Sequence, residues 1–167
     1  DMVLFHMTSS NDTDTAFSAP QPVSGWEYMT KNNMRAAACG YVFRKEVLGD
    51  LRFTPGIYHE DEEFTPQLLL HSDRVFDTNA PAYYYRQRTE SITHNPDRKV
   101  IDKRLEDILH VIDHLKCIAS QSPTHDKVAL ERRVAQLTMD YLYHVIVLFQ
   151  SRQQLDVAIE VLQEKGL

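Results

Sequence analysis

The stretch HEDEEFTPQLLL, residues 59–70, places four consecutive carboxylates, residues 60–63, directly before an apolar run. Adjacent like charges repel, so such a run needs a helix N-terminus, a metal ion or water to stabilise it. The pattern predicts a helix over residues 62–71, which begins inside the acidic run. Pro66 fits this helix only in its first turn, where a backbone N–H has no partner within the helix. The acidic run therefore marks either a functional site or a solvated helix start.

The segments on either side of this helix mix strand and helix patterns. The opening letters DMVLF predict a buried strand at residues 2–5, and residues 26–47 look mostly helical, in two pieces: WEYMTKNNM, then YVFRKEVLGD. Gly49 is the expected stop of the second piece. RVFDTNAPAYYYRQR, residues 74–88, predicts a strand, a turn and a second strand, because three tyrosines follow the break at Pro81.

Beyond residue 95 the apolar period becomes helical. Asn95 is a suitable N-cap and Pro96 a suitable first residue for a long helix. Two further helices are expected after Ser122-Pro123 and after Ser151. The first of the three helices places apolar residues on one face, at Ile101, Leu105, Ile108, Ile112 and Leu115.

Composition excludes several classes of protein. The chain has 167 residues, a net charge of −6 and 18 Lys and Arg residues without a long basic block, which argues against nucleic-acid binding. Cys39 and Cys117 have no zinc spacing and give no disulfide framework, which favours a reducing cytoplasmic setting. No apolar run approaches the roughly 20 residues of a membrane span. Because the sequence opens directly on a strand pattern, we expect a piece of a longer chain.

Four motifs follow one another at short intervals: FRKEVL (residues 43–48), RFTPGI (52–57), EDEEF (60–64) and YYYRQRTESIT (83–93). In this order they resemble the second half of the catalytic domain of family 2 glycosyltransferases, which have the GT-A fold. The resemblance covers about residues 1–95.

The resemblance implies an α/β fold that is mostly helical in this chain. Residues 1–95 would form the acceptor-side half of a GT-A nucleotide-sugar transferase domain with few strands. Residues 96–167 would form a C-terminal helical region of three helices, in which no motif is recognised.

The resemblance also implies inverting transfer of a sugar from a nucleotide-sugar donor to a hydroxyl of a saccharide or lipid-linked acceptor, in bacterial surface polysaccharide synthesis. Asp61 would be the general base, because a sugar hydroxyl must lose its proton as it attacks the anomeric carbon. Glu60 would orient Asp61 or hold the acceptor.

The tyrosine-rich segment would close over the donor diphosphate. Arg86 and Arg88 would face its developing negative charge, and Ser91 or Thr93 would donate hydrogen bonds. His94 is the candidate metal ligand that the resemblance suggests.

The resemblance would place the first half of the family's domain, with the D-x-D motif that binds a divalent Mg or Mn ion, upstream of residue 2, and these 167 residues do not contain it. Asp12 and Asp14, in DTD, match this motif by letters only, since they follow a Ser/Asn loop. We therefore expect the metal to belong to the full-length enzyme and the fragment alone to be inactive and free of metal. The setting would be the cytoplasm, including the inner face of the membrane, and an exposed sheet edge would favour self-association.

Simpler readings of the same residues stay open. The acidic run can be a polar helix start, and Arg86 and Arg88 can pair with Asp77 or Glu90 on the surface. The rival function is a non-catalytic helical module for protein interaction. We treat six histidines as structural: His59, His71, His110, His114, His125 and His144.

Overall fold

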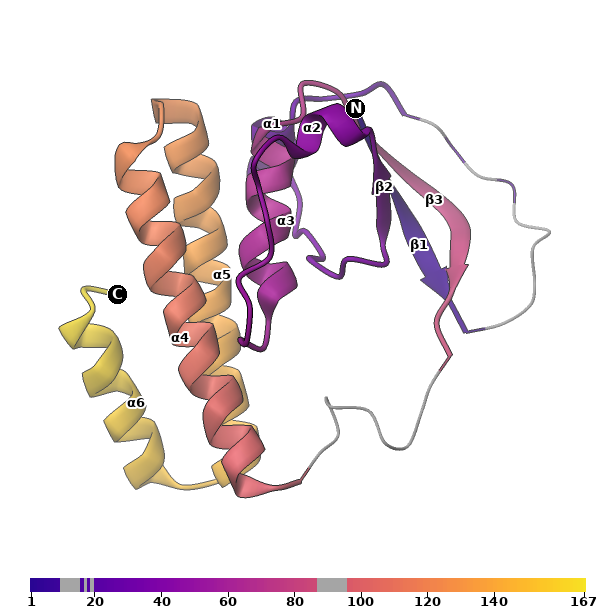
Figure 1. Cartoon of the computed structure of the whole chain (residues 1–167). Helices are drawn as coiled ribbons and strands as arrows, with labels where there is room; N and C mark the ends of the chain where they lie inside the picture. Colours follow the sequence, from indigo (N-terminus) through magenta and orange to yellow (C-terminus); the bar gives the residue numbers. More distant parts are fainter. Residues whose placement is uncertain (10–15, 17, 19, 87–95) are drawn as a thin grey trace.

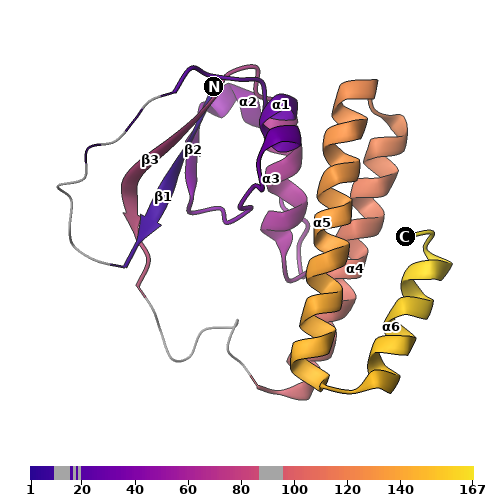
Figure 2. The same cartoon turned by 180° about the vertical axis from the view of Figure 1, so that it is seen from behind.

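The computed structural model describes residues 1–9, 16, 18, 20–86 and 96–167. In chain order, the elements are β1 (Met2–Thr8), α1 (Gly25–Lys31), β2 (Tyr41–Phe43), α2 (Lys45–Leu48), α3 (Glu60–Leu70), β3 (Val75–Tyr84), α4 (Arg98–Gln121), α5 (Thr124–Phe149) and α6 (Arg152–Glu164). The predicted mixed α/β class, mostly helical with few strands, is thus confirmed for the described residues. Figures 1 and 2 show the sheet on one side, α1 and α3 in the middle, and α4, α5 and α6 on the far side.

β1 is the central strand of a sheet with the order β2-β1-β3. It pairs antiparallel with β2 and parallel with β3, and Met2 lies opposite both Phe43 and Val75. Met2 and Leu4 are buried and alternate with less buried neighbours, as the two-residue period of a strand requires. The strand predicted at residues 2–5 is therefore confirmed.

Two predictions on the sheet are wrong. Tyr41–Phe43, predicted as helix, is strand β2, because these β-forming residues can pair with the edge of β1. The predicted strand, turn and second strand are one strand, β3. The register shifts on either side of the pair of His6 and Pro81, because β3 has extra residues there, and this irregular part of the ladder contains the residue that lacks a backbone N–H. Gly49 does end α2, at a φ of 52°.

α3 joins the sheet to the helical side. It begins at Glu60, two residues earlier than predicted, so Pro66 lies in its second turn and not in its first. Leu68 and Leu69 of α3 are fully buried in one core cluster with Met2 of β1. At the end of α3 the chain comes very close to α1, because a Cβ on Gly25 would lie 1.7 Å from the Leu69 carbonyl oxygen. Only glycine fits there.

The three predicted C-terminal helices are confirmed as α4, α5 and α6. Asp97 caps α4, with its side chain accepting from the Lys99 N–H at 2.9 Å, so this helix begins two residues later than predicted. Ile112 and Leu115 of α4 pack with Leu130 of α5, and each fully buried side chain stabilises the fold by roughly 1.5–3 kcal/mol. Among the described residues no helix is both long enough and apolar enough to cross a membrane.

Candidate functional site

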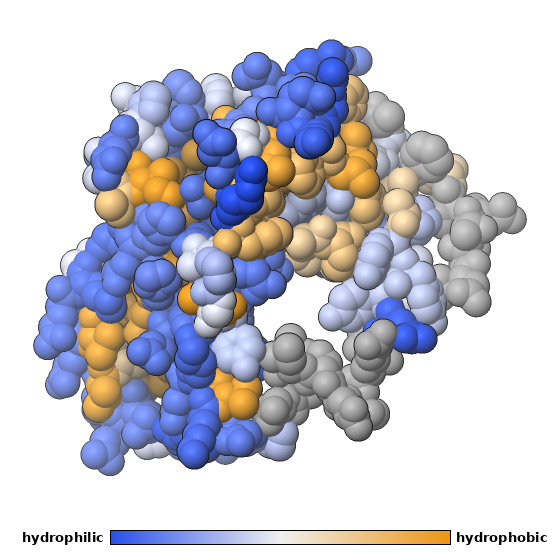
Figure 3. Space-filling view, viewed as in Figure 1, coloured by the Kyte–Doolittle hydropathy of each residue, from blue (hydrophilic) through white to orange (hydrophobic). Residues whose placement is uncertain are grey.

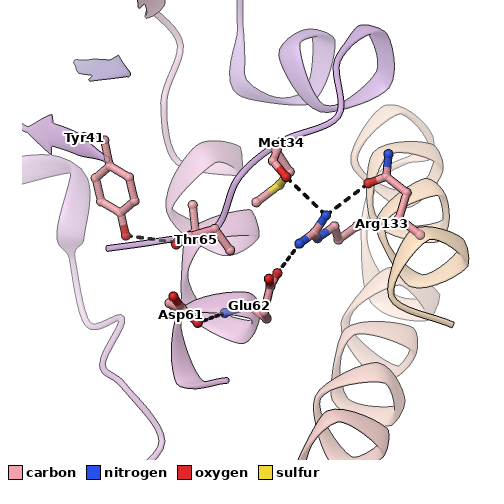
Figure 4. Close-up of polar contacts among 8 residues, drawn as sticks. Met34, Tyr41, Asp61, Glu62, Thr65 and Arg133 are labelled. Carbon is pink, nitrogen blue, oxygen red and sulfur yellow. Dashed lines mark hydrogen bonds and ion pairs between the residues drawn. The ribbon is translucent and has the colours of Figure 1, made fainter. Parts of the chain in front are cut away.

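The acidic run lies in the first turn of α3, and its four carboxylates point in different directions. Successive residues of an α-helix are about 100° apart around its axis. Glu60 is exposed, Asp61 and Glu62 are partly buried, and Glu63 is buried. Figure 4 shows Asp61 on the side of α3 that faces Tyr41, and Glu62 on the side that faces α5. The run is therefore no single cluster of charge.

Glu62 and Arg133 connect α3 to α5 through a buried ion pair. Arg133 is 6% exposed, and its Nη2 donates to Glu62 Oε2. Its Nη1 also donates to the Met34 carbonyl at 3.3 Å and to Gln136 Oε1 at 3.2 Å. Burial raises the pKa of the Glu62 carboxyl, and the Arg133 charge works against this rise. Glu62 thus holds the middle layer of the protein to the helical side.

Glu63 makes the second connection, to α4. Its side chain is 2% exposed and contacts His114 Nδ1. Nearby on α4, Asp107 accepts a hydrogen bond from the Tyr58 backbone N–H at 2.8 Å and pairs with Lys103. These contacts fix the turn that precedes α3, and they agree with the structural role expected for His114.

Asp61 is the partly buried carboxylate of the run that pairs with no cation among the described residues. Its Oδ1 accepts a hydrogen bond from the Glu62 backbone N–H at 3.0 Å. No described residue donates a hydrogen bond to its other oxygen, Oδ2. The negative charge of Asp61 acts on Glu62 and on Tyr41, and raises the pKa of both. Asp61 is therefore held through one oxygen, and its other oxygen has no hydrogen-bond donor among the described residues.

A chain of neutral hydrogen bonds lies beside Asp61. Thr65 is one turn after Asp61 on the same side of α3, and its Oγ1 donates to the Ala36 carbonyl at 2.6 Å. A hydroxyl has one proton, so the Tyr41 hydroxyl, 2.9 Å away, must donate to Thr65 Oγ1. Burial, and then the charge of Asp61, raises the pKa of Tyr41. The phenol stays protonated and fixes the wall next to Asp61 (Figure 4).

His59 precedes α3 with a left-handed backbone, at φ 63° and ψ 29°. Its ring borders a cavity of about 110 Å³ between the start of α3, α4 and α5. The lining is mostly apolar and includes Leu105 of α4 and Leu137 of α5, together with Glu62 of α3. Burial, and then the charge of Arg104, lowers the pKa of His59, so the fold favours the neutral ring.

Two hollows lie on the sheet side of α3. The space-filling view shows an open recess between the sheet and the helical part (Figure 3), and Asp61 is on the sheet side of α3 in Figure 4. A separate polar hollow of about 180 Å³ lies beside the carboxyl half of β1, lined by His6, Tyr28, Arg35 and Asp77. Parallel strands commonly present ligand sites at their carboxyl ends, and β1 and β3 are the parallel pair here.

Only some of the predicted site residues lie in the part of the chain that the structure describes. Glu60 is exposed next to Asp61, and Arg86 is exposed just beyond the end of β3. Within the described ranges, Arg86 forms no ion pair with Asp61, Glu60 or Asp77. The other predicted residues lie outside the described part of the chain: Arg88, Ser91, Thr93 and His94, together with Glu90 and the DTD letters at Asp12 and Asp14.

The described residues do not supply a metal site. In the parts of the chain that the structure describes, no three His, Cys, Asp or Glu side chains are grouped so that they could hold a metal ion. The candidate ligand His94 is outside these parts. Cys39 and Cys117 are free thiols.

Sequence reasoning missed Thr65, Tyr41 and Arg133. The spacing of Thr65, four residues after Asp61 on a predicted helix, places both on one face and could have identified the first. Arg133 is 71 residues from Glu62, and no local pattern points to this pair.

Comparisons of the chain with protein-family models, with curated proteins and with solved structures found no match in any of the three.

Proposed function

We propose that the chain is the acceptor-side part of an inverting glycosyltransferase, with Asp61 as the general base. The donor would be a nucleotide-sugar and the acceptor a saccharide or a lipid-linked saccharide. The proposal rests on the four motifs between residues 43 and 93. It gains support from the different surroundings of the acidic residues in α3.

One observation carries the proposal: Asp61 has no contact with a basic side chain among the described residues, whereas its neighbours Glu62 and Glu63 each have one. Glu62 and Glu63 each contact a basic side chain of the helical region, at Arg133 and His114. Asp61 has no such contact within the described residues, although it is partly buried. A general base needs this combination, because a carboxylate whose oxygens contact another side chain is not accessible to a substrate hydroxyl, and one in bulk solvent is poorly positioned.

The proposed reaction is one displacement. An acceptor hydroxyl lies within hydrogen-bonding distance of Asp61 Oδ2, and its oxygen attacks the anomeric carbon of the donor. The new C–O bond forms as the bond from that carbon to the diphosphate oxygen breaks, which inverts the anomeric centre. Asp61 takes the hydroxyl proton, and the nucleoside diphosphate leaves with the bonding electron pair.

The neighbouring residues have supporting roles in this proposal. The Glu62 backbone N–H, 3.0 Å from Asp61 Oδ1, directs the other oxygen toward the acceptor. Tyr41 and Thr65 keep the sheet-side wall fixed through their hydrogen bonds to each other and to Ala36. Arg86, exposed after β3, would approach the phosphates of the leaving group.

A divalent metal ion in the complete enzyme would stabilise charge on the diphosphate. Since the described residues do not group into a metal site, the steps assigned here use the side chains of this chain alone.

The test is transfer by the complete gene product, which contains the donor-binding half under this proposal. Asp61→Asn keeps the shape and the acceptor oxygen for the Glu62 N–H but cannot take a proton. We expect transfer to fall about 10²- to 10⁴-fold. Binding of the nucleotide-sugar, measured by calorimetry, should stay within about threefold of wild type, a difference of roughly 0.7 kcal/mol.

Asp73→Asn is the matched control, because Asp73 is an exposed acid between α3 and β3. Transfer by this control should be unchanged. A rate for Asp61→Asn within about fivefold of wild type, a change near 1 kcal/mol, would refute the role of Asp61 as the general base. A complete gene product that transfers no sugar at all would favour the non-catalytic helical module.

A further inference from the structure

α5 carries apolar side chains on two opposite faces. One face, with Leu130, Leu137 and Tyr141, is buried against the rest of the protein. The other carries Val128, Ala135, Met139, Tyr143 and Ile146, spaced by seven, four, four and three residues, which keeps them on one side of a helix. We call this second set the outer stripe of α5.

The outer stripe is open to solvent along most of the helix. Met139 is 65% exposed, Tyr143 63%, Val128 51% and Ile146 50%. Figure 2 shows α5 in front of α4 in the helical part, with α6 to one side. Exposed apolar residues scattered singly need no explanation, whereas several on one side of a single helix indicate a contact surface.

A shallow groove of about 450 Å³ runs beside the stripe. The segment that follows α1 forms one wall with Asn33 and Met34, and α5 forms the other with Ala135, Gln136 and Met139. Ala135 leaves space in this groove because its side chain is small. The polar rim is fixed, since Asn33 Oδ1 accepts from Arg132 at 2.9 Å and from Gln136 at 2.8 Å.

Along the stripe, the large side chain of Tyr143 and the groove at Ala135 lie at equal distances from Met139, on opposite sides of it. Tyr143 is four residues after Met139, and Ala135 is four residues before it. Four residues of α-helix span about 6 Å along the axis. If two α5 helices lie antiparallel with a twofold axis at Met139, Tyr143 of each copy meets Ala135 and the groove of the other. Such self-complementarity is what a twofold interface requires.

We propose that the outer stripe of α5 binds a second copy of this chain, in an antiparallel contact centred on Met139. Tyr143 of each copy fills the groove between α5 and the Asn33–Met34 segment of the other. The surface differs from the sheet edge for which sequence analysis predicts self-association, and the inference does not depend on the proposed transferase activity.

The small size of the surface is typical of a weak, reversible contact. From residue 128 to residue 146 the stripe is about 27 Å long, and a helix with its side chains is about 10–12 Å wide. The contact therefore buries roughly 300 Å² on each copy from the helix alone, below the roughly 800 Å² of a standard interface. We expect a reversible dimer with a dissociation constant in the range of about 10–100 μM.

Sedimentation equilibrium of the 167-residue chain tests the proposal. From about 10 μM to about 1 mM, the mean mass of the wild type should rise from monomer toward dimer. Met139→Glu places two carboxylates against each other at the axis, and should weaken association at least about tenfold. Val157→Glu is the matched control, since Val157 is an apolar residue of α6 with 48% exposure, outside the stripe. This control should dimerise like the wild type.

A mixture of two variants tests whether Met139 faces its own copy. Met139→Glu and Met139→Lys should each stay monomeric alone, because like charges meet at the axis. An equal mixture should recover dimers of one copy of each. Both variants change a side chain exposed to 65%, and their circular dichroism and unfolding curves should match those of the wild type.

Several outcomes would overturn the proposal. These are a wild type that stays monomeric up to about 1 mM, Met139→Glu associating as strongly as wild type, or Val157→Glu losing association equally. A monomeric wild type that binds phosphatidylglycerol vesicles through the stripe would also contradict it, and would assign this surface to a membrane.

Discussion

The two sides of α3 differ in how they are held. On the side of the helical region, Glu62 forms an ion pair with the buried Arg133 of α5, and the buried Glu63 contacts His114 of α4. On the side of the sheet, Thr65 takes part in neutral hydrogen bonds, and Asp61, the neighbour of Glu62, pairs with no cation among the described residues. Residues adjacent in sequence thus have opposite surroundings.

The difference shows how one helix start can connect the layers of the fold and still leave one carboxylate without a cation among the described residues. The helix dipole favours carboxylates at this end, so four of them can be placed there at little cost. The 100° rotation per residue then directs Glu62 and Glu63 toward partners in the helical region and leaves Asp61 on the side of α3 that faces Tyr41 (Figure 4). The mutations below test this division from the largest expected effect to the smallest.

Arg133→Met should destabilise the chain most. It removes the cation from Glu62, which remains partly buried, and the donor from the Met34 carbonyl at 3.3 Å. Breaking a buried ion pair from one side costs about 3–5 kcal/mol. Urea unfolding followed by circular dichroism measures the loss.

Two controls accompany this variant. Arg152→Met removes an arginine that is 94% exposed and 4.0 Å from Asp156, and should change stability by less than about 0.5 kcal/mol. The double variant Glu62→Gln, Arg133→Met should recover part of the loss, because no unpaired charge remains. A loss below about 1 kcal/mol for Arg133→Met would mean that the pair does not hold α3 to α5.

Thr65→Val tests the sheet side and should have a smaller effect. The change keeps the shape of the side chain but leaves the Tyr41 hydroxyl and the Ala36 carbonyl without their common partner. Loss of such buried hydrogen bonds costs about 1–3 kcal/mol. Thr65→Ser keeps the hydroxyl, so in the same unfolding assay it should lose less than Thr65→Val. Equal losses would show that packing, and not the hydrogen bonds, makes Thr65 important.

His59→Asn should change the pH dependence of stability. Asparagine tolerates the left-handed backbone at φ 63° and does not titrate. Burial lowers the pKa of His59 below its usual 6.5, so on acidification the unfolded chain binds this proton first. Wild-type stability should therefore fall relative to the variant as pH drops from 6.5 through the lowered pKa. The raised pKa of Glu62 makes the unfolding free energy change with pH in the opposite direction. This contribution is the same in wild type and His59→Asn, so it cancels in the comparison.

Unfolding curves at several pH values between about 5 and 8 give the stability difference between the two proteins. A difference that does not change with pH would show that His59 titrates alike in the folded and unfolded chain.

The sequence predicts the helical region better than the sheet. The three C-terminal helices follow from apolar residues such as Ile108 and Leu115, because helical periodicity is local. β2 was missed because Tyr41–Phe43 precedes a short helix and pairs with a strand more than thirty residues earlier. The continuous β3 depends on the parallel partner β1, which no local pattern around Pro81 reveals.

The sequence identifies the candidate site residues through their motifs but does not predict their surroundings. The four motifs direct attention to Asp61, and helical spacing places Thr65 beside it. What distinguishes Asp61 from Glu62 is the position of Arg133, which is fixed by the packing of α5 on α3 and not by any residue nearby in sequence.

The central claim is that the fold uses Glu62 and Glu63 and leaves Asp61 free for chemistry. The unfolding free energy of Asp61→Asn tests it most directly. Asparagine keeps the oxygen that accepts from the Glu62 N–H, and the lost helix-dipole interaction is offset by weaker repulsion of Glu62. The account predicts a value within about 0.5 kcal/mol of wild type, as for a residue without a structural role. A loss of about 2 kcal/mol or more would contradict it, because Asp61 would then be a structural carboxylate like its neighbours.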